Sequence, residues 1–435
     1  MFSFRRPDSS PPGPSRFFLY LEAALLLLLS LSLLSSYTKR YPLFNQADSS
    51  LYELKEEQGE NTSKPPENTG SETAPGASDA GKNAQGKKFI QWVDFTVTAE
   101  ALDKAFRLDL DTCLSEPHLN WIELLAYLGA RYGGDFSRYK ASDMDKLAEK
   151  LLGGESMENL TKEMEYYPYY LEAYTAVLGG MVGPFREEIP ADQAPKPSDA
   201  ENMAGEETSE GTENMTGEEA SEGTKNMAGE ETSDNPENSS NEPNKADTVW
   251  VTKYGLKAFS PIASGFPYSD YDDFGTARSY GFKRQHLGHD MMGQVGTPII
   301  AVESGTVEAL GWNQYGGWRI GIRSFDQKRY YYYAHLRKNY PYQSNLEVGS
   351  TVQAGDVIGY MGRTGYSSKE NTNNIDESHL HFGLQLIFDE SQKEGNNEIW
   401  ISCYELVKFL RQNQCLTEKI PDTKEWQRVY KTEEK

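Results

Sequence analysis

Cysteine is scarce in this chain of 435 residues. The three cysteines, Cys113, Cys403 and Cys415, are too few and too scattered for a disulfide scaffold or a zinc knuckle. Any metal site must therefore use histidine and carboxylate side chains. Basic residues are also in the minority, because 43 Lys and Arg stand against 66 Asp and Glu. The net charge of −23 argues against nucleic acid as the main partner, since phosphate binding needs clustered basic residues.

One long hydrophobic run lies near the N-terminus. Residues 17–36 read FFLYLEAALLLLLSLSLLSS, which is about the length of a membrane-spanning helix and contains one charged residue, Glu22. Three arginines lie within residues 1–16, and the positive-inside tendency makes these residues a cytoplasmic tail. We expect a retained single-pass anchor in the cell membrane with the rest of the chain on the extracellular, cell-wall side. The alternative is a cleaved signal peptide.

Two segments have too few apolar residues to fold by themselves. Residues 37–87 are rich in Ser, Gly, Pro, Asn and Glu, which predicts a disordered tether. Residues 186–247 hold 18 acidic and 4 basic residues. This second segment repeats ENMAGEETSEGT, ENMTGEEASEGT and KNMAGEETSDNP with a period of twelve residues. Met and Ala alone give no apolar face for stacking, so we interpret 186–247 as an acidic disordered linker that separates two domains.

The remaining segments carry patterns of folded domains. Within 88–185, apolar residues at helical spacing end three times on paired glycines, which predicts a small all-α domain of about four helices. Residues 248–415 contain short Val-, Ile- and Tyr-rich runs between Gly, Pro and Asn turns, followed by the helix-like IWISCYELVKFLRQ. This pattern predicts a mainly antiparallel β-sheet or open barrel-sandwich with a C-terminal helix. Residues 416–435 read as a polar tail.

Five of the six histidines fall between His286 and His381. In SHLHFGLQL, residues i and i+2 of a strand share a face, so His379 and His381 point together into one space while Leu380 and Phe382 face a core. The segment RQHLGHDMMG adds His286 and Asp290 from one short stretch. His381 would complete a His/Asp/His set that leaves the fourth position of a tetrahedral zinc ion to water, as a hydrolase requires.

These motifs occur in a familiar order. The segments HLGHD, GTPIIAVESGTVEAL, YYAHL, VGSTVQAGDVIGYMGRTGYS and HLHFGL resemble, in order and spacing, the lysostaphin-type (LytM-like) zinc metallo-endopeptidases of bacterial peptidoglycan. The resemblance covers roughly residues 275–390. It implies a duplicated hybrid motif fold, peptidoglycan peptides as partners, and hydrolysis of peptide bonds in crosslinks or stem peptides outside the cell.

The resemblance also assigns roles to single residues. It implies that His286, Asp290 and His381 bind Zn²⁺ and that His335 and His379 serve catalysis. His289 neighbours a ligand but faces the other side of the chain, so we expect a supporting role. His118 has no visible ligand companion. We expect the tyrosines at 330–333 to alternate between the core and the wall of the cleft.

One departure from the family pattern and two alternatives remain. Residues 368–377, SKENTNNIDE, are inserted before the HxH strand and would shape substrate access. The LEVGSTVQAGDVIGYMG hairpin also resembles biotinyl and lipoyl carriers, but it offers Met361 and Arg363 where those domains present lysine. The more serious alternative is a non-catalytic envelope scaffold or regulator of wall hydrolysis on the same fold. The 88–185 helices could bind an envelope protein partner.

Overall fold

The computed structural model describes residues 80–82, 88–194, 248–280, 282–393 and 397–434. The predicted cytoplasmic tail, anchor and acidic repeats lie outside these residues, as does most of the predicted tether. They therefore stay predictions. Among the helices in the described ranges, none combines the length and the apolar character needed to cross a membrane.

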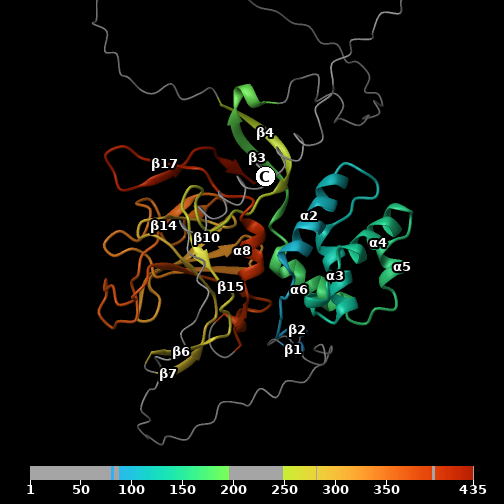
Figure 1. The fold of residues 1–435 in the computed structure, drawn as a ribbon, viewed down its shortest axis with the longest axis horizontal. Helices are drawn as coiled ribbons and strands as arrows, with labels where there is room; N and C mark the ends of the chain where they lie inside the picture. Colours follow the sequence, from blue (N-terminus) through green and yellow to red (C-terminus); the bar gives the residue numbers. More distant parts are fainter. Residues whose placement is uncertain (1–79, 83–87, 195–247, 281, 394–396, 435) are drawn as a thin grey trace, which may run out of the picture. The chain divides into compact units, whose positions relative to one another are not determined.

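The segment predicted to be helical contains five α-helices, which Figure 1 shows grouped together. They are α2 (Ala99–Thr112), α3 (Trp121–Tyr132), α4 (Ala141–Leu152), α5 (Met157–Thr161) and α6 (Tyr167–Leu178). Asn120 caps α3 by accepting hydrogen bonds from the backbone N–H groups of Ile122 and Glu123, and Gly133 ends it with a φ of 66°. The paired glycines predicted to stop three helices follow α3, α4 and α6. The short α5 is the helix that the sequence pattern did not indicate.

A short β-hairpin precedes these helices, and strands dominate the rest of the chain. The hairpin pairs β1 (Ala80–Lys82) with β2 (Lys88–Ile90). The main sheet has the order β13-β10-β11-β12-β15-β8-β5, with β16 also paired to β15, and all its pairings are antiparallel. Its strands are β5 (Ser269–Asp270), β8 (His289–Met292), β10 (Gly305–Asn313), β11 (Gly317–Ser324), β12 (Arg329–Ala334), β13 (Thr351–Val352), β15 (His379–Leu386) and β16 (Ile399–Ile401). The predicted antiparallel β-sheet of the C-terminal part is confirmed.

Small strand pairs surround this sheet. They are β6 (Ala277–Tyr280) with β7 (Phe282–Gln285), β9 (Pro298–Ile300) with β14 (Val357–Tyr360), and β17 (Thr417–Lys419) with β18 (Trp426–Arg428). A three-stranded sheet contains β3 (Val182–Pro190), β4 (Thr248–Leu256) and β19 (Thr432–Glu433). Helix α8 (Tyr404–Leu410) follows β16, in the place where the sequence predicted a C-terminal helix.

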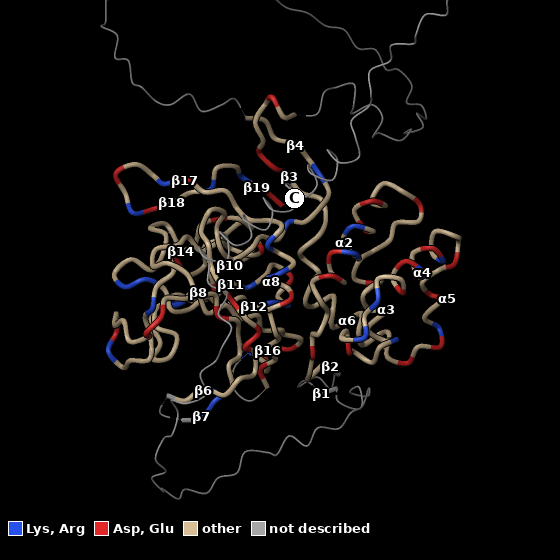
Figure 2. Tube along the Cα trace, viewed as in Figure 1, with Lys and Arg blue, Asp and Glu red and all other residues tan. Residues whose placement is uncertain are grey.

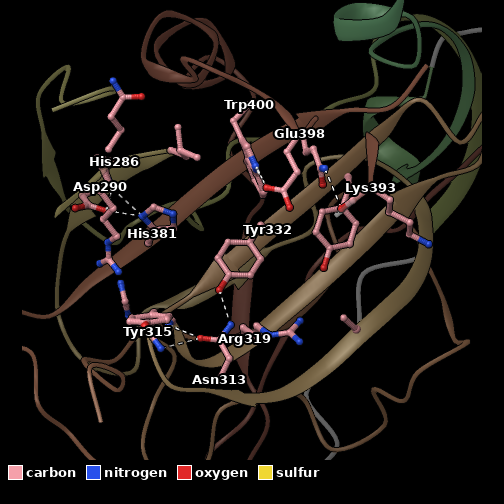
Figure 3. Close-up of a pocket in the computed structure, with 18 of the residues that line it drawn as sticks. His286, Asp290, Asn313, Tyr315, Arg319, Tyr332, His381, Lys393, Glu398 and Trp400 are labelled. Atoms are coloured by element: carbon pink, nitrogen blue, oxygen red, sulfur yellow. Dashed lines mark hydrogen bonds and ion pairs between the residues drawn. The ribbon is translucent and has the colours of Figure 1, made fainter. Parts of the chain in front are cut away.

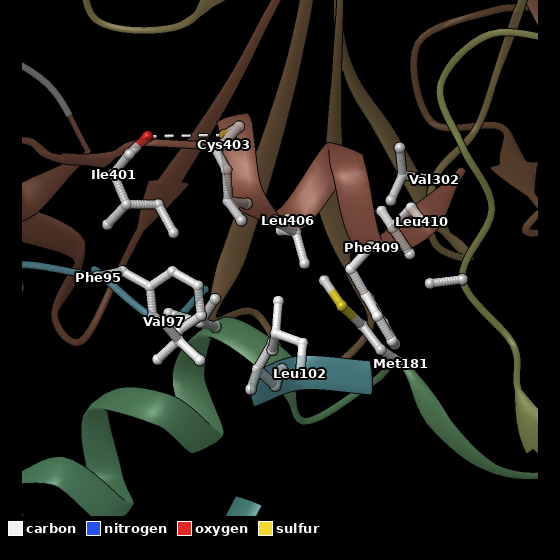
Figure 4. Packing of buried hydrophobic residues seen from close by; sticks show 14 of the residues in the cluster. Phe95, Val97, Leu102, Met181, Val302, Ile401, Cys403, Leu406, Phe409 and Leu410 are labelled. Carbon is white, nitrogen blue, oxygen red and sulfur yellow. Dashed lines mark hydrogen bonds between the residues drawn. The ribbon is translucent and has the colours of Figure 1, made fainter. Parts of the chain in front are cut away.

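The helices and the sheet share one hydrophobic core. Leu102 of α2 and Phe409 of α8 belong to the same buried cluster, together with Val302 and Cys403 (Figure 4). The ring of Phe409 contacts Phe106 at 5.9 Å and Trp121 at 6.0 Å between ring centroids. Apolar side chains of the helices and of the sheet segment are buried against one another in this cluster. Burial of this apolar surface holds the two segments together.

A buried ion pair crosses the same contact. Arg329 of β12 bonds both carboxylate oxygens of Glu303, at 2.7 and 3.0 Å. Its remaining amino group donates to the carbonyl of Ala176 in the last turn of α6, at 2.8 Å. A cation at a helix C-terminus satisfies carbonyls that have no partner within the helix. A second hydrogen bond joins the two segments at α2. Glu405 of α8 accepts it from the backbone N–H of Ala99 at the start of α2, at 2.6 Å.

Two strands flank the predicted acidic linker and pair with each other. Strands β3 and β4 pair along nine residues each, from Val182 opposite Leu256 to Pro190 opposite Thr248. Residues 195–247 lie outside the described residues, so their role as a linker stays a prediction. Strand β3 also crosses the domain boundary that was predicted at residue 185. No local pattern indicates this strand, because its partners in the ladder lie more than fifty residues away.

The residues predicted to form a polar tail also have defined structure. Strands β17, β18 and β19 all lie within 416–435, and β19 pairs with β3. Trp426 packs against a second buried cluster that includes Cys415. All three cysteines are free. Lys residues are interspersed with Asp and Glu along α4 in Figure 2, so this helix presents no uniformly basic face.

Removal of the Arg329 guanidinium tests the buried ion pair. We expect Arg329→Met to lower the free energy of unfolding by about 3–5 kcal/mol, because it leaves the buried Glu303 carboxylate without its counter-ion. The exposed Arg107→Met variant is the control and should change stability by at most about 0.5 kcal/mol. Chemical denaturation followed by circular dichroism measures both. Equal stability of the two variants would contradict this account.

Candidate active site

Strand β15 brings the candidate site residues together from both of its edges. On one edge, His381 lies opposite Asp290 of β8, and on the other it lies opposite Ala334, directly before His335. His379 faces the same side as His381, two residues earlier. Leu380 and Phe382 point the other way and are fully buried, as the alternation predicted.

Three donor atoms converge at this point. The Nε2 atom of His286 lies 3.0 Å from Oδ1 of Asp290 and 2.9 Å from Nδ1 of His381. The third side of the triangle, from Nδ1 of His381 to Oδ1 of Asp290, is also 2.9 Å. Figure 3 shows these side chains turned toward one another. In tetrahedral zinc sites the ligand atoms are about 3.3 Å apart, so this nearly equilateral N/O/N set fits a zinc ion with little adjustment.

A second carboxylate orients the first ligand. The Nδ1 atom of His286 lies 3.1 Å from Oδ2 of Asp273, a residue with no exposed surface. Asp273 also accepts a hydrogen bond from Arg278 at 2.7 Å, and Arg278 reaches Oδ2 of Asp290 at 3.4 Å. A carboxylate behind a ligating imidazole fixes the ring and its tautomer. Sequence reasoning missed Asp273, because nothing in its local pattern distinguishes it from the exposed Asp272.

The electrostatics of the cluster favour a bound cation. Burial disfavours the charged imidazolium of His286, but hydrogen bonds to Asp273 and Asp290 outweigh it and raise the pKa of His286 to about 9. Burial would raise the pKa of Asp290, yet hydrogen bonds from His286 and His381 hold it well below its usual range. The site therefore attracts positive charge, whether as a proton or as a metal ion.

His335 and His379 lie beside the three donor atoms and point their free nitrogens toward them. The Nδ1 atom of His335 donates to the carbonyl of Thr364 at 2.9 Å, and Nδ1 of His379 donates to the carbonyl of Glu377 at 2.9 Å. Because a carbonyl only accepts, the proton of each neutral ring sits on Nδ1 and leaves the Nε2 lone pair available. The two rings are 4.7 Å apart between centroids, and Nε2 of His379 is 3.8 Å from Oδ1 of Asp290.

His335 is held in an unusual conformation and protonation state. Burial, together with the nearby His379 and His381, lowers the pKa of His335 well below its ordinary value. The ring is therefore neutral at pH 7. Its backbone has a φ of 61°, a left-handed conformation that non-glycine residues adopt mainly where the surrounding structure enforces it. Gly365 makes this possible, because a Cβ atom there would lie 3.1 Å from Nδ1 of His335 and 2.4 Å from the carbonyl of Tyr315.

The other two histidines lie outside the metal cluster. Nε2 of His289 bonds Asp270 at 2.8 Å, behind the ligands, so it has the supporting position that was expected. His118 lies in the helical segment, where its Nε2 contacts Asp109 at 3.0 Å. Asp109 also accepts the hydroxyl of Tyr254 at 2.6 Å, which links the helices to β4.

A groove of about 740 Å³ extends from the metal cluster across the sheet. Four tyrosines and one tryptophan line it: Tyr315, Tyr330, Tyr332, Tyr366 and Trp400. Tyr330 and Tyr332 face the groove while Tyr331 and Tyr333 are fully buried, which confirms the predicted alternation. Arg284 lies over the rings of Tyr315 and Tyr366, at 5.2 and 4.9 Å from their centroids.

The inserted segment 368–377 is fastened to the rim of the domain. Oδ1 of Asn371 accepts hydrogen bonds from the indole N–H of Trp318 and from the backbone N–H of Asn339, both at 2.9 Å. Ile375 is buried, and its carbonyl accepts a hydrogen bond from Arg363 at 3.0 Å. The insertion is therefore packed against the domain directly before His379 in the chain.

Comparison with known proteins agrees with this geometry. Residues 284–394 match the model of Peptidase family M23. This segment is a peptidase M23 domain. The L-Ala–D-Glu endopeptidase of Bacillus subtilis is 37% identical over 130 residues, which cover 30% of this chain and 38% of the relative. Lysostaphin of Staphylococcus simulans is 39% identical over 98 residues, which cover 22% of this chain and 17% of the relative.

A solved structure is also similar to this segment. The catalytic domain of lysostaphin from Staphylococcus simulans is 30% identical, with 32% of this chain and 92% of that chain covered and a TM-score of 0.26. The chain spans less than two fifths of the length of the two curated relatives. The predicted lysostaphin-type family is thus confirmed for the M23 segment, whereas the duplicated hybrid motif and the membrane anchor stay predictions.

The carboxylate behind His286 gives a test of the metal site. We expect Asp273→Asn to weaken Zn²⁺ binding by about 10–100-fold, because the neutral amide no longer holds His286 and Arg278 in place. Competition with a chromophoric chelator measures the affinity. The neighbouring Asp272→Asn, at an exposed position, should bind zinc like the unaltered protein. A similar loss in both variants would mean that Asp273 does not orient the ligand.

Proposed function

We propose that this chain is a membrane-anchored zinc metallo-endopeptidase that hydrolyses peptide bonds in peptidoglycan on the outer side of the cell membrane. The observation that carries the proposal is the convergence of His286, Asp290 and His381 in a groove, with two further histidines close beside them. A scaffold protein has no need for this set. The match to the M23 family and the endopeptidase relatives support the same reaction class.

His286, Asp290 and His381 would hold the ion. A bound Zn²⁺ would act as a Lewis acid that polarises the scissile carbonyl and lowers the pKa of water. The neutral His335 can accept a proton from the attacking water at its Nε2 atom, because its Nδ1 proton is engaged by Thr364. His379 holds its Nε2 lone pair on the same side, where it can accept a hydrogen bond from the water and so orient it.

The groove supports a peptide as the substrate. Its length along the sheet and its aromatic walls suit an extended chain, which the rings of Tyr332 and Trp400 would flank (Figure 3). We expect the packed insertion at 368–377, directly before His379 in the chain, to shape substrate access. Which bond is cut depends on the side chains that this groove accepts, and the relatives include both an L-Ala–D-Glu endopeptidase and a glycyl-glycine endopeptidase.

The location outside the membrane rests on the sequence. Residues 17–36 form an apolar run with arginines on its N-terminal side, and residues 37–87 have the composition of a flexible tether. An anchored enzyme with such a tether can reach a polymer layer near the membrane while it stays bound to the cell. The outer surface of helices α2–α6 is available to an envelope protein partner.

Chelation tests the proposed reaction. We expect the full-length protein to release peptides from purified peptidoglycan, and the release to stop after treatment with a zinc chelator and to return with added Zn²⁺. Mass spectrometry of the released fragments identifies the bond that is cut. Hydrolysis that persists in chelated protein without bound metal would refute the proposal.

The two classes of histidine should separate in variants. We expect His381→Ala to lose both the bound zinc and the activity, because it removes one of three ligands. His335→Ala should keep one zinc per chain but lose about 100-fold or more in hydrolysis, because it removes the proton acceptor alone. Elemental analysis gives the zinc content, and fragment release gives the activity. Equal zinc loss in both variants would reject the division of roles.

A further inference from the structure

The groove contains an arginine without a counter-ion. Arg319 of β11 lines the groove beside Asn313 and Tyr332, and Figure 3 shows these three side chains together on the groove surface. Its Nε atom is buried and has no hydrogen-bond partner among the described residues. Within the same residues, no carboxylate forms an ion pair with its guanidinium. A buried donor without an acceptor is unfavourable unless a ligand supplies one.

The other charged groups of the groove are engaged. Glu308 binds Nε of Arg323 at 3.1 Å and also pairs with Lys393. Glu398 accepts the indole N–H of Trp400 at 2.6 Å. Arg284 lies over two tyrosine rings and donates to the hydroxyl of Tyr366. Arg323 on the same strand forms an ion pair with Glu308, whereas no described carboxylate pairs with Arg319.

The phenol groups of Tyr330 and Tyr332 lie within the electrostatic reach of Arg319. Burial raises the pKa of Tyr330 to about 12, and the positive charge of Arg319 opposes this rise. Burial likewise raises the pKa of Tyr332, against the effects of Asn313, Arg319 and Arg284. Both phenols therefore keep their protons at neutral pH. A guanidinium with phenol hydroxyls around it offers several donors to one anionic group.

We propose that Arg319 binds a carboxylate of the substrate, so that the groove selects peptides with a free acid group over the same peptides with a carboxamide. The inference rests on the proposed peptidase function and specifies its substrate class. A guanidinium binds a carboxylate through two parallel hydrogen bonds, which the opposite charges strengthen. A carboxamide is uncharged and cannot form this charge-assisted pair. A segment of neutral residues alone, such as the interior of an oligoglycine chain, would offer Arg319 only uncharged carbonyl oxygens and is disfavoured for that reason.

The test compares peptides that differ in one group. The probes are a peptidoglycan stem peptide, versions in which each free carboxylate is converted in turn to a carboxamide, and pentaglycine with an amidated C-terminus. The full-length protein should prefer the free acid over one of the amides by at least about tenfold in kcat/KM, as expected for one charge-assisted contact. Arg319→Gln should abolish this preference, and Arg319→Lys should retain part of it. Arg107→Gln, on the exposed face of α2, should leave the preference intact.

Binding gives a readout that does not depend on catalysis. Calorimetry with chelator-treated full-length protein measures the affinity for the same probes without cleavage. We expect the acid-over-amide preference in this experiment too, with its loss in Arg319→Gln. If the unaltered protein binds all probes equally, or if Arg319→Gln keeps the preference, the subsite inference fails although the peptidase function can stand. If the preference in binding is present but no probe and no peptidoglycan is cleaved, the proposed function fails and the subsite stands.

Discussion

Strand β15 is hydrogen-bonded to β8 along one edge and to β12 along the other, and every candidate ligand depends on this register. A slip by one residue would turn His379 and His381 toward the core and push Leu380 and Phe382 into the groove. Burial of those two apolar side chains opposes the slip, because each stabilises the folded chain by about 1.5–3 kcal/mol. The hydrophobic side of the strand thus holds the polar side in position.

Strand β12 links the site to the helices. Its end leads into His335, while its buried face carries Arg329, Tyr331 and Tyr333. The hydroxyl of Tyr331 donates to Glu303 at 2.6 Å, and Glu303 in turn holds the arginine that contacts the last turn of α6. The helices are therefore part of the support of the catalytic strand. This support explains how a backbone φ of 61° can be maintained at His335.

The sequence was most informative where a motif is local. The HxxxD pattern places His286 and Asp290 four residues apart, and strand alternation puts His379 and His381 on one face. The family resemblance was needed to join His381 to the other two, because it lies 91 residues from Asp290. Asp273 and the Arg329 contact to α6 could not be predicted, because each depends on segments distant in sequence that carry no motif. The pairing of β3 with β4 was hidden for the same reason, because the two strands are separated by a long acidic segment.

That pairing has a consequence for the twelve-residue repeats. Pro190 and Thr248 are held opposite each other, so the intervening chain leaves and returns to nearly the same place. The entropy of closing such a loop depends only weakly on its length, and each doubling costs about 0.6 kcal/mol. Copies of the repeat can then be gained or lost by duplication and deletion with little penalty to folding. Repeat number is therefore free to vary among descendants of this sequence, while the residues on either side of it are constrained by their partners in the strand.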